Sequence, residues 1–249
     1  MWVSCLEKRV CKGNMVKAQE MWKRTLAWRE ENHVAQVLYE PQPHFFTIKE
    51  CYPHIFHGKT RKGELVCYEK PGCFNAHGLI NGGVSPAELG RHYMYINECL
   101  YSRMLPRDED RIMTVLDVGE ITRKLLNPAA VSFLKVTAEI MQSHYPERVA
   151  RICVVNCPFW LPAAWKSVAP MLATATVEKI SFSSSSQSLT ELQKWLDDDQ
   201  IPPEYGGAGA KLGSSPEEQY MLDLVAYLNG DRDDGAADGD GDEEGAAAA

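Results

Sequence analysis

Short apolar segments alternate with helix-forming segments along the middle of the chain. The apolar segments are rich in β-branched residues and are typical of buried strands, whereas the segments between them carry good helix formers. We expect strands at 65–69, 111–118, 151–156 and 179–183, and helices at 86–105, 128–143 and 162–172. A helix between two successive strands favours parallel pairing of those strands. The order therefore predicts an α/β fold with a mostly parallel sheet.

Further helices are predicted outside this alternating region, at 15–31, 190–196 and 215–229. The start of the helix at 86–105 has the sharpest local signal. Ser85 is expected at its N-cap, Pro86 at the first helical position and Glu88 at the third, which is a capping box. Gly230 is expected to end the last helix.

The net charge of −8 is concentrated at the C-terminal end of the chain. Residues 231–249 hold eight acidic residues and one arginine, so they carry seven of the eight net negative charges. We expect this segment to be a disordered acidic tail. The rest of the chain is nearly neutral, which excludes a strongly basic nucleic-acid-binding protein.

Cysteine usage and hydropathy predict a soluble cytosolic protein. The eight cysteines include no CxxC pair, and in a chain of 249 residues they indicate free thiols in a reducing compartment. The N-terminal residues have no apolar run of the signal-peptide type, and no window approaches 18 apolar residues.

Motifs for catalysis, nucleotide binding or metal binding are not convincing. The sequence has no GxSxG nucleophile elbow, and the glycine-rich run at 206–213 lacks the spacing of a phosphate-binding loop. His54 and His57 form an HxxH in a segment expected to be a loop, without a third ligand at a recognisable spacing. We expect a surface or packed histidine pair there, and we expect no enzyme activity, no metal and no cofactor.

Two of the expected helical segments, 128–143 and 158–172, are apolar on most sides. A helix that covers a sheet needs only one apolar face. The excess apolar surface therefore indicates either a thick core or an apolar cavity, and the pattern alone leaves both possibilities open.

Polar residues occur just before two of the expected strands. Glu147 precedes the strand at 151–156, Lys179 opens the strand at 179–183, and Thr176 lies nearby. If these strands are parallel neighbours, Glu147 and Lys179 lie at the same edge of the sheet and can pair. Such a pair with a hydroxyl group suits a polyol or phosphate headgroup, although the spacing alone favours a structural salt bridge.

The same segments resemble a known family in order and spacing. The motifs are YPER at 145–148, ICVVNCPF at 152–159, TVEKI at 176–180 and IPPEYGG at 201–207. Together they resemble the CRAL-TRIO lipid-binding family, the Sec fourteen-like phosphatidylinositol transfer proteins, over about residues 15–207. The resemblance implies a mixed, mostly parallel sheet that floors an apolar lipid pocket closed by a gate helix.

The resemblance also implies an organisation of the chain. A residual N-terminal helical segment would occupy 1–40, the lipid-binding domain 41–210, a C-terminal amphipathic helix 211–230 and the acidic tail 231–249.

The site residues follow from the family's motifs. In the family, a phosphatidylinositol headgroup is held by positions that correspond here to Glu147, Thr176, Lys179 and Lys12. Of the positions that hold a second lipid, phosphatidylcholine, only Thr114 keeps the residue type expected. The gate helix, which would contact the membrane, is expected to carry Phe159, Trp160, Leu161 and Trp165, although these side chains could instead be core.

We therefore expect a monomeric, non-enzymatic protein that binds one phospholipid, phosphatidylinositol in the first place. It would transfer this lipid between membranes or present it to a lipid kinase, through transient contact with a membrane surface. A sterol-like or tocopherol-like ligand is an alternative. Another is a lipid-regulated interaction module in which residues 211–249 carry the function.

Overall fold

A five-stranded sheet forms the centre of the computed structural model, which describes residues 10–107, 109–122, 139–172 and 174–231. The strands lie in the order β1-β2-β3-β4-β5, and only β1 is antiparallel to its neighbour. Their bounds are β1 His54–Lys59, β2 Leu65–Glu69, β3 Ile112–Asp117, β4 Val149–Val155 and β5 Ile180–Phe182. The predicted α/β fold with a mostly parallel sheet is confirmed.

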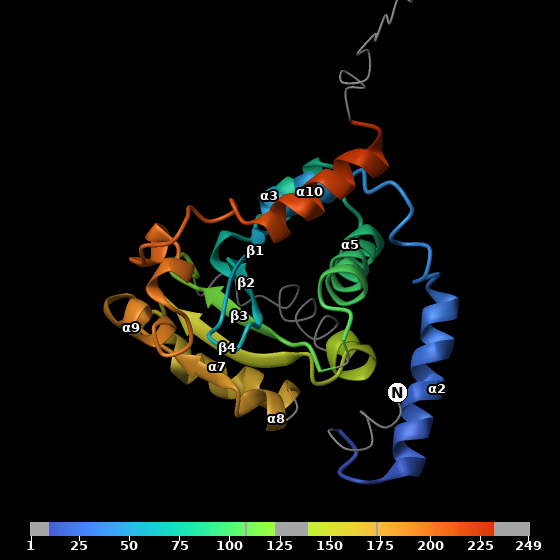
Figure 1. Ribbon diagram of the computed structural model, residues 1–249, viewed down its shortest axis with the longest axis horizontal. Helices are drawn as coiled ribbons and strands as arrows, with labels where there is room; N and C mark the ends of the chain where they lie inside the picture. Colours follow the sequence, from blue (N-terminus) through green and yellow to red (C-terminus); the bar gives the residue numbers. More distant parts are fainter. Residues whose placement is uncertain (1–9, 108, 123–138, 173, 232–249) are drawn as a thin grey trace, which may run out of the picture.

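Helices surround this sheet (Figure 1). The α-helices are α2 Met15–Glu31, α3 Phe45–Cys51, α4 Ala76–Asn81, α5 Pro86–Cys99, α7 Leu161–Val168, α8 Thr174–Val177, α9 Ser188–Leu192 and α10 Pro216–Asn229. A π-helical turn, Leu100–Met104, continues α5. The α10 helix contacts the β1 edge, whereas α7 and α8 lie towards the β5 edge, and α2 lies beyond α5 at the side of the molecule.

One face of the sheet, the α9 face, is covered by a core of buried, mostly apolar side chains. Its side chains come from alternate positions of β2, β3 and β4 and pack against Leu192, Leu196 and Ile201, all fully buried. This packing buries the apolar side chains on this side of the three central strands.

The opposite face, the α5 face, has a different environment at each end. The side chains that share it by register are Phe56, Leu65, Cys67, Ile112, Thr114, Leu116, Ile152, Val154, Ile180 and Phe182. At the β1 and β2 end they are buried against α5, the π-helical turn and α10. At the β4 and β5 end, Ile152, Ile180 and Phe182 remain half-buried.

Local sequence signals predicted several boundaries well. The capping box at the start of α5 is formed, since the Ser85 hydroxyl accepts from the Glu88 amide and the Glu88 carboxylate accepts from the Ser85 amide. The strand at 65–69 has its predicted bounds. Helix α10 starts after Ser215 and stops at Gly230, whose φ of 77° lies in the left-handed region that favours a residue without a Cβ atom. Most of the expected helix at 128–143, and the acidic tail apart from Asp231, lie outside the described residues.

The segment around His54 and His57 was wrongly expected to be a loop. It forms β1, and both imidazoles are buried rather than exposed. His54 pairs with His92 of α5 and not with His57. A glycine and two histidines within six residues obscure the apolar alternation that identifies the other strands.

The His54–His92 pair is neutral because it is buried. His54 donates from Nδ1 to the Tyr52 carbonyl at 2.7 Å, so its Nε2 accepts from His92 Nε2 at 3.1 Å. Burial, with a contribution from the Lys49 ammonium, holds the pKa of His54 well below its ordinary value and lowers the pKa of His92 to about 3.

We predict that the free energy of unfolding decreases as the pH falls below about 6.5. There the unfolded chain protonates both imidazoles while the folded chain does not, at a cost of about 1.4 kcal/mol per pH unit for each histidine. Urea unfolding of the wild type, His92→Gln and the exposed-site control His33→Gln between pH 7 and 5 checks this. In His92→Gln, the slope of the unfolding free energy against pH should be smaller than in the wild type by about 1.4 kcal/mol per pH unit, which corresponds to one proton. A slope equal to that of the His33→Gln control would contradict the prediction.

Candidate lipid-headgroup site

Glu147 and Lys179 meet at one edge of the sheet. Glu147 lies two residues before β4 and Lys179 immediately before β5, and these strands are parallel neighbours. The Lys179 Nζ atom lies 3.1 Å from Glu147 Oε2, and each side chain is 21% exposed. The structure therefore brings the two charges together in a half-buried position, accessible to a ligand at the amino ends of the strands.

Thr176 belongs to the same turn as Lys179. It lies in α8, is half-buried, and its carbonyl accepts from the Lys179 amide at 3.0 Å. The Lys179 carbonyl in turn accepts from the Ile152 amide at 3.0 Å. These backbone bonds fix the α8–β5 turn against β4, so that Thr176 and Lys179 are presented together.

Lys12 is placed differently from the other three. It lies in the turn before α2 with a φ of 50°, and its side chain is exposed. Among the described residues, no hydrogen bond or ion pair joins it to Glu147, Thr176 or Lys179.

Thr114 lies on the α5 face, in the middle of β3. Its neighbours by register are Cys67 of β2 and Ile152 of β4, and it is 7% exposed. Farther along the same face, Leu116 is half-buried like Ile152, Ile180 and Phe182, whereas its register neighbour Val154 is buried. Half-buried aliphatic residues on a central strand are unusual, because such positions are normally covered completely.

The expected gate segment corresponds to α7, with Phe159 and Trp160 just before it. Phe159 is 92% exposed, whereas Trp160, Leu161 and Trp165 are half-buried. The Trp165 ring packs against Phe182 of β5 with 5.5 Å between ring centroids. Helix α7 therefore covers the β5 end of the α5 face, with one large aromatic side chain directed to solvent beside it.

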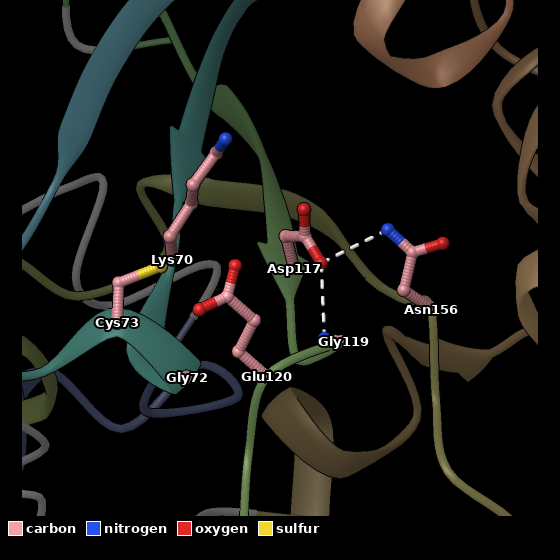
Figure 2. A pocket seen from close by; sticks show the side chains of 7 residues that line it. All are labelled: Lys70, Gly72, Cys73, Asp117, Gly119, Glu120 and Asn156. Carbon is pink, nitrogen blue, oxygen red and sulfur yellow. Dashed lines mark hydrogen bonds between the residues drawn. The ribbon is translucent and has the colours of Figure 1, made fainter.

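A separate polar pocket of about 150 Å³ lies at the carboxyl edge of the sheet (Figure 2). Asp117 Oδ1 accepts from the Gly119 amide at 3.1 Å and from Asn156 Nδ2 at 2.9 Å, and Asp117 Oδ2 accepts from the Tyr205 hydroxyl at 3.1 Å. Oδ1 thus joins the segments that follow β3 and β4, and Oδ2 joins β3 to the turn at Pro203–Tyr205. This pocket lies at the opposite edge from the Glu147–Lys179 pair.

Glu69 is a site candidate that the sequence analysis missed. It aligns with Leu116 in the sheet register, and its Oε2 accepts from the Tyr52 hydroxyl at 2.6 Å. Burial raises the pKa of Glu69 above its ordinary value, and the Tyr52 bond opposes that shift. A carboxylate at the end of the otherwise uncharged strand at 65–69 was the available signal.

The described residues hold no candidate metal site, disulfide or membrane-spanning helix. Within the described residues, no three His, Cys, Asp or Glu side chains are arranged to hold a metal ion. The seven cysteines in those ranges are free thiols. None of the described helices combines the length and the apolar character needed to span a bilayer.

The sequence matches a known domain family over most of the described sheet and helices. The CRAL/TRIO domain matches residues 49–207, so the chain belongs to that family of lipid-binding and lipid-transfer domains. The family predicted from the motifs is confirmed.

Individual relatives extend the similarity. The chain is 27% identical to SEC14 cytosolic factor of Eremothecium gossypii over 89% of its own length and 73% of the relative. It is 24% identical to phosphatidylinositol/phosphatidylcholine transfer protein SFH13 of Arabidopsis thaliana over 80% of its own length and 33% of the relative. Among eight curated relatives, the chain spans from 33% to 79% of the relative's length, and 38% of Patellin-3 of Arabidopsis thaliana.

A solved structure, the crystal structure of Sfh5, has the same fold. It superposes with a TM-score of 0.66 over 89% of this chain and 78% of that chain, at 16% sequence identity. This likeness confirms the predicted fold class.

Proposed function

We propose that this protein binds one phospholipid, phosphatidylinositol, and transfers it between membranes. The acyl chains would lie along the β4 and β5 end of the α5 face, and the headgroup would contact Glu147, Thr176 and Lys179. The ammonium of Lys179 would offset the phosphate charge, while Glu147 and Thr176 would bond the polyol. The observation that carries this proposal is the half-buried Glu147–Lys179 pair at the amino ends of β4 and β5, the two strands whose Ile152, Ile180 and Phe182 remain half-buried on the α5 face.

The same proposal includes how the protein works. The lipid-binding unit spans 41–210, acts as a monomer in the cytoplasm and performs no covalent chemistry. Lys12 contributes to the headgroup site and Thr114 to a second lipid's headgroup. The α7 segment is the gate, and the exposed Phe159 beside it enters the bilayer interface during transient contact, as amphipathic aromatic surfaces do. The released lipid is presented to a lipid kinase.

Substitution of Lys179 tests the headgroup assignment. We expect Lys179→Ala and Glu147→Ala to reduce transfer of labelled phosphatidylinositol between vesicles about tenfold, which corresponds to one charge-assisted hydrogen bond. Lys194→Ala is the matched control, because it removes the lysine of another Lys–Glu pair on the α9 side. Wild-type transfer rates for both site variants would contradict the assignment.

A second candidate ligand is an apolar molecule with a single hydroxyl group, of the sterol or tocopherol class. Glu69 favours it, because a carboxylate beside the α5 face could accept a hydrogen bond from such a hydroxyl. The identity of the lipid that co-purifies with the protein distinguishes the two candidates.

A further inference from the structure

The turn that carries Glu147 has a strained backbone. Glu147 has a φ of 59°, in the left-handed region that costs a residue with a side chain about 1–3 kcal/mol. Such a conformation persists only where the surrounding structure holds it. The residues on either side, Tyr145 and Arg148, are buried, so the turn is held between two anchors.

The anchor that follows Glu147 is the guanidinium of Arg148. Its Nη1 donates to the carbonyl of Arg107 at 2.7 Å and to that of Asp110 at 3.1 Å. The guanidinium also lies over the Tyr101 ring, 4.9 Å from its centroid. This anchor fixes the start of β4.

The anchor that precedes Glu147 is the hydroxyl of Tyr145, and it leads to α2. The hydroxyl donates to Glu98 Oε1 of α5 at 2.6 Å. Glu98 is held from the other side by Arg29 of α2, which donates from both Nη atoms to the two carboxylate oxygens at 2.7 and 2.8 Å. A bidentate bond to a buried carboxylate has a fixed geometry. Arg29 therefore fixes the position of the Glu98 carboxylate that accepts the hydrogen bond from the Tyr145 hydroxyl.

Helix α2 also contacts the two residues before Tyr145. The Trp28 ring stacks on His144 with 4.0 Å between centroids and an interplanar angle of 8°. The Thr25 hydroxyl donates to the Ser143 carbonyl at 3.1 Å. Through these contacts and the Arg29–Glu98–Tyr145 chain, α2 holds three consecutive residues, 143–145, directly upstream of the strained turn.

We propose that Tyr145, Glu98 and Arg29 are positioning residues that hold the Glu147 carboxylate towards Lys179, and that α2 thereby sets headgroup selectivity. The inference rests on the proposed function, since it assigns a role to residues behind the proposed headgroup site. None of the three contacts the lipid. Their effect is on the recognition of the headgroup and not on the uptake of acyl chains.

The test removes one hydroxyl group. Tyr145→Phe keeps the ring and leaves Glu98 paired with Arg29, so the variant should fold. The matched control is Tyr95→Phe, since Tyr95 lies on the same helix as Glu98 and its buried hydroxyl has no hydrogen-bond partner among the described residues. Each protein is incubated with vesicles that contain equal amounts of phosphatidylinositol and diacylglycerol, and the bound lipid is quantified by mass spectrometry.

We expect Tyr145→Phe to lower the ratio of bound phosphatidylinositol to bound diacylglycerol about tenfold, as for the loss of one hydrogen bond to a charged group, with Tyr95→Phe unchanged. A ratio equal to that of the wild type, or an equal loss of both lipids, would overturn the inference. Lys179→Ala in the same experiment separates the two proposals. If Lys179→Ala lowers the ratio and Tyr145→Phe does not, only the positioning role fails, whereas the proposed function fails if Lys179→Ala has no effect.

Discussion

Substitution of Lys49 with methionine is expected to lower the free energy of unfolding by about 3–5 kcal/mol. The Lys49 Nζ lies 2.7 Å from Glu218 Oε1, and the Glu218 side chain is 2% exposed. Without the ammonium, the only bond from another described segment to the Glu218 carboxylate would be from the Phe56 amide, at 2.9 Å from Oε2. The loss is large because the attraction to Lys49 no longer offsets the free-energy cost of removing the Glu218 carboxylate from water.

A neighbouring pair on α10 provides the control, since Lys49 lies in α3 and Lys59 at the end of β1. Lys59 of β1 pairs with Glu217 of α10 at 2.8 Å, but the Lys59 side chain is 55% exposed. Lys59→Met should therefore cost less than about 1 kcal/mol, since water screens an exposed pair. Urea denaturation of both variants measures the difference, and equal losses would show that burial of Glu218 is not what makes the contact between α10 and α3 stabilising.

The second large effect is expected at Arg29. Arg29→Met should lower the free energy of unfolding by about 3 kcal/mol, because the buried Glu98 carboxylate would be left with only hydroxyl partners among the described residues. Arg24→Met, at an exposed position of the same helix, should have an effect below about 0.5 kcal/mol. The measurement is denaturant unfolding at pH 7.

A double substitution tests the cause of the Arg29 effect. When Glu98→Gln is added to Arg29→Met, the buried charge disappears, and part of the lost stability should return. If the double variant is less stable than Arg29→Met, the uncompensated charge of Glu98 is not the reason for the destabilisation.

Much of the fold was predictable because its signals are local or follow from strand order. The capping box at Ser85 and the apolar run at 65–69 each act within a few residues of sequence. The contact between Glu147 and Lys179 was predictable because parallel neighbouring strands bring their amino ends to the same edge of a sheet. That inference needed the order of the strands and no detailed coordinates.

The parts that were missed depend on contacts between distant segments. Arg29 and Glu98 are 69 residues apart in the sequence, and each is an ordinary charged residue in a helical segment. Their pairing arises only when α2 packs beside α5, which no local pattern encodes. The β1 strand was missed for a related reason, since its histidines are buried by α5 and α10 and are not apolar in sequence.

The α5 face also clarifies the ambiguity in the apolar helices. A thick core and a lipid pocket both require excess apolar surface, and composition cannot distinguish them. In the structure, the apolar side chains at the β1 and β2 end are buried by helices, whereas Leu116, Ile152, Ile180 and Phe182 are half-buried. The proposed acyl-chain site lies at these half-buried positions.

Native mass spectrometry of the purified full chain, followed by identification of the bound lipid, tests the central claim most directly. The account predicts one phosphatidylinositol molecule per protein, and loss of that lipid from Lys179→Ala with the chain still folded. Recovery of the protein with a sterol-like or tocopherol-like molecule, or without any lipid after exposure to phosphatidylinositol vesicles, would contradict it.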